Sequence, residues 1–368
     1  MEIGLDVITV FGFFALVGVL LILDRKNIEF NYGLIIRRWK HGQYVMDKWI
    51  FSHRKFLGIF GTIGVIVGFL ATALGVFSIL YATVLGQQSV APILPTVGDY
   101  QYPSGVVGVP FWFWIISIVV VLSVHEPMHA IFARLAGVPV RSWGIMTFFV
   151  LPLGAFVDPD MRKVYKLTLM QKLKIFAGGS FGNFIAGTVV LVMILLLSYS
   201  LFGQTNVPGG PADLAGLEGK IKSVDGVEIR NLNNLSVVLN ETAPGSVLQV
   251  VTDKGTYEVV TSANANSGRG SYIGMTFGIR PEYAQWKDSI STFMQLLNWL
   301  LIFNVGIGIF NMMPMRPFDG GHVFEAVFAK ILGSEKAGKT AINITSVAVL
   351  GILLFNLFGP GIVKALFI

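Results

Sequence analysis

The chain has 368 residues, of which 54% are hydrophobic and only 13% charged, which excludes a large soluble domain and indicates a membrane-embedded protein. The net charge of +6 does not indicate nucleic-acid binding, because the basic residues gather in short loops beside apolar segments. Cysteine is absent, which excludes disulfides and thiolate ligands, so any zinc must be held by histidine and carboxylate.

The N-terminal region, residues 1–108, is predicted to hold two membrane spans and a basic loop. Residues 3–23 form an apolar segment with acidic residues at its start and no small-residue cleavage site after it, so we expect a retained helix. Residues 24–55 are basic and aromatic, and are expected to form a cytoplasmic loop on anionic headgroups. A charge-free span follows from Phe56, with its helical part ending near Gly86.

A third span begins near Val109 and ends in the motif His125-Glu126-Pro127-Met128-His129. Residues four apart share a helix face, so His125 and His129 can present two imidazoles to one metal ion, with Glu126 placed to take a proton from water. A catalytic zinc site has three protein ligands and one open position, so a third ligand must come from elsewhere. Ionisable residues at membrane depth are usually functional. The motif therefore predicts a zinc site inside a membrane, toward the cytoplasmic end of this span.

Residues 134–174 are again basic, which predicts a cytoplasmic location. Within them Met146 to Val157 is apolar but interrupted by Pro152 and Gly154, and favours a strand or hairpin over a helix. Irregular backbone at membrane depth is tolerated only where it packs against protein or lines a water-filled cavity. This segment is therefore a candidate binding site for an extended peptide, which would pair with it by strand addition. A plain interfacial loop is the alternative.

The next charge-free stretch, residues 175–212, opens with a glycine-rich segment and completes the first part of a predicted core, residues 109–203. Gly179 and Asn183 lie four apart on one helix face. Glycines in membrane helices mostly permit close helix packing. An amide in an apolar span requires a partner, which makes Asn183 a candidate functional residue.

A polar segment with strand-like runs is predicted to be a small extracytoplasmic domain, residues 204–285. The second part of the core, residues 286–368, then contains two more spans, for about six transmembrane helices in a polytopic α-helical protein. Asp319 follows the first of these spans on a Pro- and Gly-rich turn, at the same predicted depth as His129. It is the candidate third zinc ligand, or it caps the helix that begins near Gly320.

Three of these segments together resemble the site-2 protease family of intramembrane zinc metalloproteases: HEPMH, GGSFGN and NMMPMRPFDGG. The residues 211–217 and 221–226 look like the start of a bacterial or archaeal PDZ domain, which part of that family carries between two core helices. The resemblance covers about residues 109–335.

The resemblance implies a zinc ion held by His125, His129 and Asp319, with Glu126 as the general base. It places Asn183 near the substrate carbonyl. Residues 146–157 correspond to a membrane-associated β-hairpin that holds substrate extended, with Gly154 and Phe156 as contacts.

The implied activity is hydrolysis of a peptide bond within or near a transmembrane segment of a membrane-anchored protein. The implied partners are that transmembrane substrate, the lipid bilayer, and a peptide or protein terminus at the PDZ-like domain; nucleic acid is not expected. Pro127 departs from a regular HExxH helix and predicts a kink there. Two alternatives remain open: an ion- or proton-coupled transporter that uses the buried acidic and histidine residues, and a PDZ-bearing membrane scaffold that does not cleave.

Overall fold

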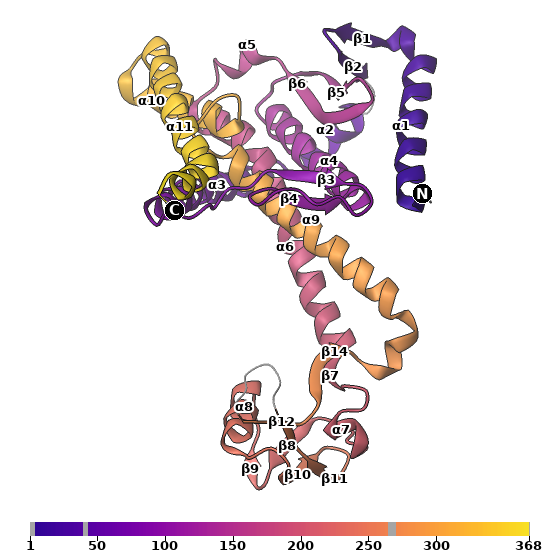
Figure 1. Cartoon of the computed structure of the whole chain (residues 1–368). Helices are drawn as coiled ribbons and strands as arrows, with labels where there is room; N and C mark the ends of the chain where they lie inside the picture. Colours follow the sequence, from indigo (N-terminus) through magenta and orange to yellow (C-terminus); the bar gives the residue numbers. More distant parts are fainter. Residues whose placement is uncertain (1–3, 40–42, 264–269, 368) are drawn as a thin grey trace. The chain divides into compact units, whose positions relative to one another are not determined.

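The computed structural model describes residues 4–39, 43–263 and 270–367, and the chain divides into two compact units. We call Met1–Leu191 with Gln295–Ile368 the membrane unit, and Val192–Met294 the inserted unit. Figure 1 shows the course of the chain through both. The predicted small domain, residues 204–285, falls within the inserted unit, although its residues 264–269 lie outside the described part.

Six helices in the described part of the chain are long and apolar enough to cross a membrane. They are α1 (Leu5–Leu23), α3 (Arg54–Val84), α4 (Phe111–Leu135), α6 (Leu169–Leu201), η2 with α9 (Pro281–Trp286 and Lys287–Asn311), and the Glu335–Gly359 part of α11 (Glu335–Phe367). Each overlaps one of the six apolar segments expected from the sequence, although α6 begins and ends earlier than the expected stretch of residues 175–212. The shorter helices of the membrane unit are η1 (Arg25–Asn27), α2 (Gln43–Ser52), α5 (Met161–Val164) and α10 (Asp319–Leu332).

The buried face of α3 includes glycines at positions 61, 64, 68 and 75. A β-carbon added at any of them would come within 2.8 Å of a side chain from a neighbouring element. These neighbours are Phe132 of α4, Phe181 of α6, Ile309 of α9 and Met312. The glycines therefore let α3 approach the helices that carry the HExxH and GGSFGN motifs, which is the role expected for small residues between membrane helices.

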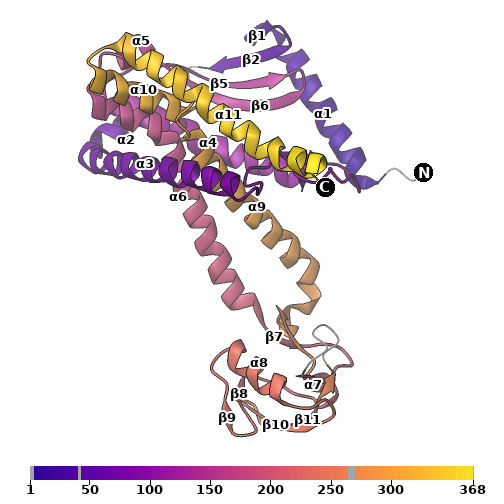
Figure 2. The same ribbon diagram turned by 60° about the vertical axis from the view of Figure 1, so that its left-hand side comes forward.

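The membrane unit also contains an antiparallel sheet of four strands in the order β1-β2-β5-β6. Its strands are β1 (Ile28–Asn31), β2 (Leu34–Trp39), β5 (Val140–Phe148) and β6 (Leu151–Pro159). Figure 2 shows the sheet and α3 at opposite edges of the unit. Residues 146–157, expected as a strand or hairpin, thus lie in β5 and β6.

Residues 24–55 differ from the single loop expected from their charges, because they contain η1, β1, β2 and α2 around the undescribed residues 40–42. Strand β2 pairs with β5 along its whole length, from Leu34 opposite Phe148 to Trp39 opposite Trp143. The N-terminal region therefore extends the β5–β6 hairpin to a four-stranded sheet.

Helix α4 continues through Pro127 to Leu135 without interruption. Its C-terminal half is packed into the main core cluster of the unit, where Ala130, Phe132 and Ala133 are almost completely buried. This cluster includes residues of α3, α6 and α10, so the HExxH motif lies at the centre of the unit. A parallel strand pair, β3 (Ile93–Thr96) and β4 (Val107–Pro110), leads into α4.

The inserted unit has a hydrophobic core of its own, formed around Val224, Val250 and Val259, which are fully buried. Its main sheet has the order β11-β10-β8-β9, and two further strand pairs are β7 with β14 and β12 with β13. The elements are β7 (Phe202–Asn206), α7 (Pro211–Leu214), β8 (Ile221–Val224), β9 (Val227–Glu228), α8 (Leu232–Glu241), β10 (Val247–Thr252), β11 (Thr256–Val260), β12 (Ser262–Ala263), β13 (Ser271–Tyr272) and β14 (Met275–Ile279).

Candidate metal centre

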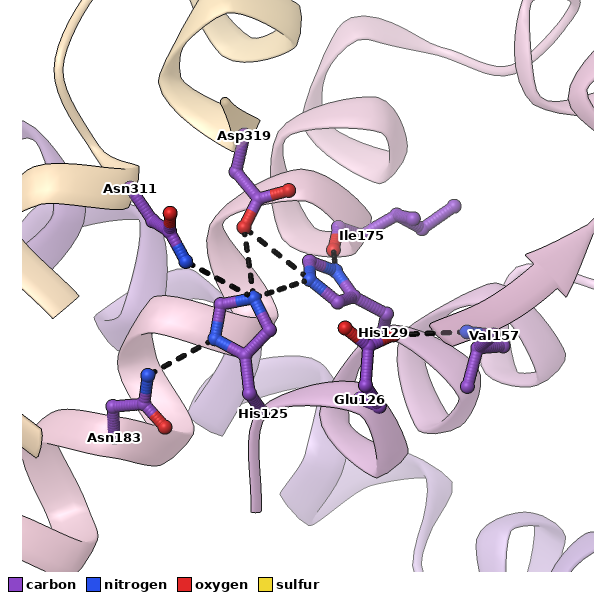
Figure 3. Close-up of polar contacts among 8 residues, drawn as sticks. All are labelled: His125, Glu126, His129, Val157, Ile175, Asn183, Asn311 and Asp319. Carbon is purple, nitrogen blue, oxygen red and sulfur yellow. Dashed lines mark hydrogen bonds and ion pairs between the residues drawn. The ribbon is translucent and has the colours of Figure 1, made fainter. Parts of the chain in front are cut away.

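Two imidazoles from α4 and one carboxylate from α10 converge in the membrane unit. The Nε2 atoms of His125 and His129 lie 3.1 Å apart, and Asp319 Oδ2 lies 3.1 Å from the first and 3.3 Å from the second. Figure 3 shows the three side chains pointing at one another, with Asn183 and Asn311 on one side of His125 and His129 on the other. The helical spacing and the distant Asp319 thus meet as one group, and no other such group of three lies in the described residues.

The hydrogen bonds around the ring of His129 decide which nitrogen is free. Its Nδ1 lies 2.7 Å from the backbone oxygen of Ile175, and a carbonyl oxygen can only accept, so Nδ1 carries the proton and donates it. In the neutral ring Nε2 is then a bare lone pair directed at Asp319 Oδ2. That oxygen is itself buried and accepts no hydrogen bond. Lone pairs that converge in this way are suited to share a cation.

The separations fit zinc. Zinc–ligand bonds of about 2.0–2.1 Å in a tetrahedral site place neighbouring ligand atoms about 3.3 Å apart, close to the three distances given above. Two imidazole nitrogens and one carboxylate oxygen also form the ligand set of a catalytic site, which leaves the fourth position open. The three residues therefore fit the metal that the sequence predicts.

The position of Asp319 follows from the two glycines after it. A β-carbon at Gly320 would clash with the carbonyl oxygen of Met312, and one at Gly321 would lie 2.7 Å from that of Met315. Glycine therefore lets α10 begin directly against the turn that follows α9. Asp319 is the first residue of α10 and Phe318 its N-cap, without a side-chain cap, so the capping role considered for Asp319 is not the one observed.

Gly179 of α6 lies directly against the ligand nitrogens. A β-carbon there would come within 2.6 Å of His125 Nε2 and would also clash with His129 Nε2. The sequence indicated only that this glycine allows helix packing. The structure adds that it leaves room for the ligand face of both imidazoles.

Asn183 lies one turn further along α6 and is fully buried. Its Nδ2 lies 3.0 Å from His125 Nδ1, while its Oδ1 is buried without a partner. If the amide is turned by 180°, Oδ1 accepts the Nδ1–H proton and leaves Nε2 of His125 free for a metal. Asn183 thus contacts a ligand of the predicted site.

Glu126 points from α4 toward the sheet. Its Oε2 accepts a hydrogen bond of 2.9 Å from the backbone N–H of Val157 in β6. The edge strand and the HExxH helix are therefore joined through the carboxylate that the sequence assigns as the general base.

Residues 113–355, more than half of the chain, match the sequence profile of peptidase family M50, which is the site-2 protease family. The chain belongs to family M50. The M50 match includes all three candidate ligands and excludes α1, β1, β2 and α3.

Three relatives accompany this match. An uncharacterized protein of Methanocaldococcus jannaschii is 28% identical over 269 residues, 70% of this chain and 66% of its own length. A Clostridium perfringens protein provisionally named a zinc metalloprotease is 21% identical over 304 residues, 62% of this chain and 90% of its own length. A zinc metalloprotease of M. jannaschii is 38% identical over 71 residues, 19% of this chain and 21% of its own. The chain thus spans just under two thirds of the first of these relatives. M50 membership and the six apolar helices support a multi-pass membrane protein.

The two predicted substrate contacts of this M50 chain have different surroundings in β6. Gly154 pairs with Met146, and a β-carbon added to it would meet nothing within 4 Å. The ring of Phe156 lies 4.9 Å from the guanidinium carbon of Arg38 and would clash with a β-carbon at Gly144. Space is therefore free at Gly154, whereas the ring of Phe156 is packed within the sheet.

Asn311 was not singled out from the sequence. It ends α9, and its Nδ2 lies 3.5 Å from His125 Nε2, on the ligand side of the ring. The available signal was an amide at the end of an apolar span, directly before the turn that leads to Asp319.

Proposed function

We propose that the protein is an intramembrane zinc metalloprotease that hydrolyses peptide bonds within or near transmembrane segments of membrane-anchored proteins. The observation that carries this proposal is the convergence of one candidate ligand atom each from His125, His129 and Asp319, within 3.3 Å of one another. Membership in family M50 supports it independently.

His125, His129 and Asp319 would hold the ion, and zinc at such a site lowers the pKa of a water molecule to about 7 and polarises a carbonyl group. Glu126 would act as the general base, taking a proton from water at the site and returning it to the leaving nitrogen of the peptide. Asn183 holds the His125 ring, so it acts through a ligand and not by contact with the substrate carbonyl. This role differs from the one that the resemblance implies for it.

The substrate class follows from the setting of the site among membrane helices. A helical segment satisfies its own backbone hydrogen bonds, so it must unwind before a peptide bond is attacked. The outer edge of β6, the last strand of the sheet, would receive the unwound segment by strand addition. In this role β6 offers backbone groups, since the ring of Phe156 is already packed.

The inserted unit is proposed to be a PDZ-like domain that binds a peptide or protein terminus. Its own core and its two short helices beside a small sheet support a separately folded module. Following the distribution of basic residues, this domain is extracytoplasmic and the zinc site lies toward the cytoplasmic side.

The test is cleavage of a transmembrane substrate by the full chain reconstituted in liposomes. Wild type should cut within the membrane segment. Glu126→Gln should lose about 10²–10⁴-fold in rate and keep its zinc. Glu282→Gln makes the same chemical change at an exposed position and should cut like wild type.

Equal cleavage by wild type and Glu126→Gln would refute the assigned base. Zinc binding without any cleavage would identify the silent scaffold instead. Proton transport without bound zinc would identify the transporter.

A further inference from the structure

A cavity of about 370 Å³ lies between α2, α3, α4 and α6, apart from the metal centre. Arg54, Gln171 and Lys174 provide its polar groups, and Phe51, Phe132 and Leu135 are among its apolar walls. No acidic side chain lines it.

The cavity lies at one end of three candidate membrane-spanning helices. Arg54 is the first residue of α3, Leu135 is the last of α4, and Lys174 is in the second turn of α6. Helix ends of this kind lie at the level of lipid headgroups. The cavity is therefore interfacial, whichever side of the membrane it faces.

The two cations of the cavity differ from those around them. Arg134 forms an ion pair with Asp47, and Lys172 Nζ lies 3.4 Å from Glu335 Oε1. Lys174 instead donates one of its three N–H bonds to the backbone oxygen of Gly58, at 2.6 Å, and no carboxylate of the described residues pairs with it or with Arg54. Two positive charges are thus left for an anion from outside the chain.

Gln171 adds neutral donors. Its Oε1 accepts hydrogen bonds from the Thr168 backbone N–H at 3.1 Å and from the Thr168 hydroxyl at 2.9 Å, as in a capping box at the start of α6. The amide is therefore held with its oxygen engaged, and its two N–H bonds stay free to donate.

We propose that this cavity binds the headgroup of an anionic phospholipid. The phosphodiester would lie between Arg54 and Lys174, and the start of the acyl chains would lie along the phenylalanine and leucine walls. Basic pockets between membrane helices are suited to such headgroups. The apolar walls favour a lipid over free phosphate. This inference is independent of the proposed proteolysis.

The test uses the full chain, purified in detergent and titrated with phosphatidylglycerol or phosphatidylcholine under native mass spectrometry. One saturable site is expected for phosphatidylglycerol. Arg54→Gln should weaken it about fivefold, as expected for loss of one cation near a headgroup, and Arg54→Lys should retain most of the binding. Lys55→Gln is the matched control, since it removes the adjacent exposed charge that does not line the cavity, and it should change nothing. Neither glutamine variant should unfold α3, because a cation is not favoured at a helix N-terminus.

Three results would overturn the proposal. Equal weakening by Arg54→Gln and Lys55→Gln would mean diffuse attraction to charge. Equal binding of phosphatidylcholine would mean that the apolar walls determine the lipid affinity and that the headgroup charge does not contribute. Displacement of the lipid by millimolar inorganic phosphate would identify a free-phosphate site.

Discussion

The backbone N–H of Val157 donates to the carboxylate of Glu126 with a nitrogen–oxygen distance of 2.9 Å, so the edge of the sheet holds the side chain assigned as the base. One carboxylate oxygen is occupied by this bond, and the other stays free for proton transfer. A backbone donor fixed in a strand holds the carboxylate in one orientation, whereas a mobile water molecule would not. Hydrogen-bond partners of the residues around a metal site are expected to have this effect.

The first prediction concerns this hydrogen bond. Val157→Pro removes the N–H that faces away from β5, a position where an edge strand tolerates proline. Cleavage should fall about 10–100-fold while zinc content stays that of wild type. Val157→Ala keeps the N–H and shortens the side chain, so it should cleave nearly as well as wild type. A cleavage rate for Val157→Pro at or above that of wild type would mean that the hydrogen bond does not help Glu126 to act as the general base.

The second prediction separates two roles for Asn183. Asn183→Leu should weaken zinc binding about 10–100-fold, because His125 loses the partner of its Nδ1. Metal content after dialysis against a graded chelator measures this. Asn304→Leu is the control, since this equally buried amide donates only to the Leu300 carbonyl oxygen of its own helix and should leave zinc unchanged. Normal zinc affinity in Asn183→Leu, together with a lower cleavage rate, would indicate that Asn183 contacts the substrate carbonyl instead of supporting His125.

The third prediction tests the room that Gly179 leaves. Gly179→Ala puts a methyl group against both ligand nitrogens, so zinc and activity should be lost together. Gly306→Ala makes the same change in a membrane helix where a β-carbon meets nothing within 4 Å, and both properties should survive. Zinc content and cleavage are measured on folded protein, checked by circular dichroism. Full zinc in Gly179→Ala would contradict the site geometry.

The fourth prediction concerns the third ligand. Asp319→Asn should lower zinc affinity by more than about 100-fold, because loss of a ligand costs more than loss of an outer partner. His322→Gln, three residues further along α10, changes a side chain that stacks on Phe176 outside the group of ligands, and should keep its zinc. If zinc content in Asp319→Asn equals that of wild type, the carboxylate is not a ligand.

The existence of six membrane helices could be predicted, because a bilayer requires a minimum run of apolar residues and the sequence shows each run directly. Their ends could be predicted less well, since α6 is Leu169–Leu201 where the charge-free stretch is 175–212. The pairing of His125 with His129 follows from helical geometry alone. Asp319 could be matched to them only through its predicted depth, since the packing that brings α10 to α4 is a tertiary property.

Strands β1 and β2 could not be predicted, because their basic residues indicate a headgroup-facing loop when taken alone. In the fold these basic residues form ion pairs with acidic residues of the same region. Arg37 pairs with Asp24, and Arg38 Nε lies 3.2 Å from Glu29 Oε1. The pairing of β2 with β5 joins residues about a hundred positions apart, and no local pattern reports it. Likewise, the partner of Asn183 depends on how α6 packs against α4.

The four-stranded sheet gives the N-terminal region a structural role beside the metal centre. A two-stranded hairpin alone is marginally stable in water, whereas further strands rigidify it. Strand β6, which binds Glu126, is thus stabilised through β5 by residues 28–39. These residues precede the stretch that this chain shares with its family. Shortening or exchanging that leading segment is therefore expected to loosen the Glu126 carboxylate from a distance, without any change to a candidate metal ligand.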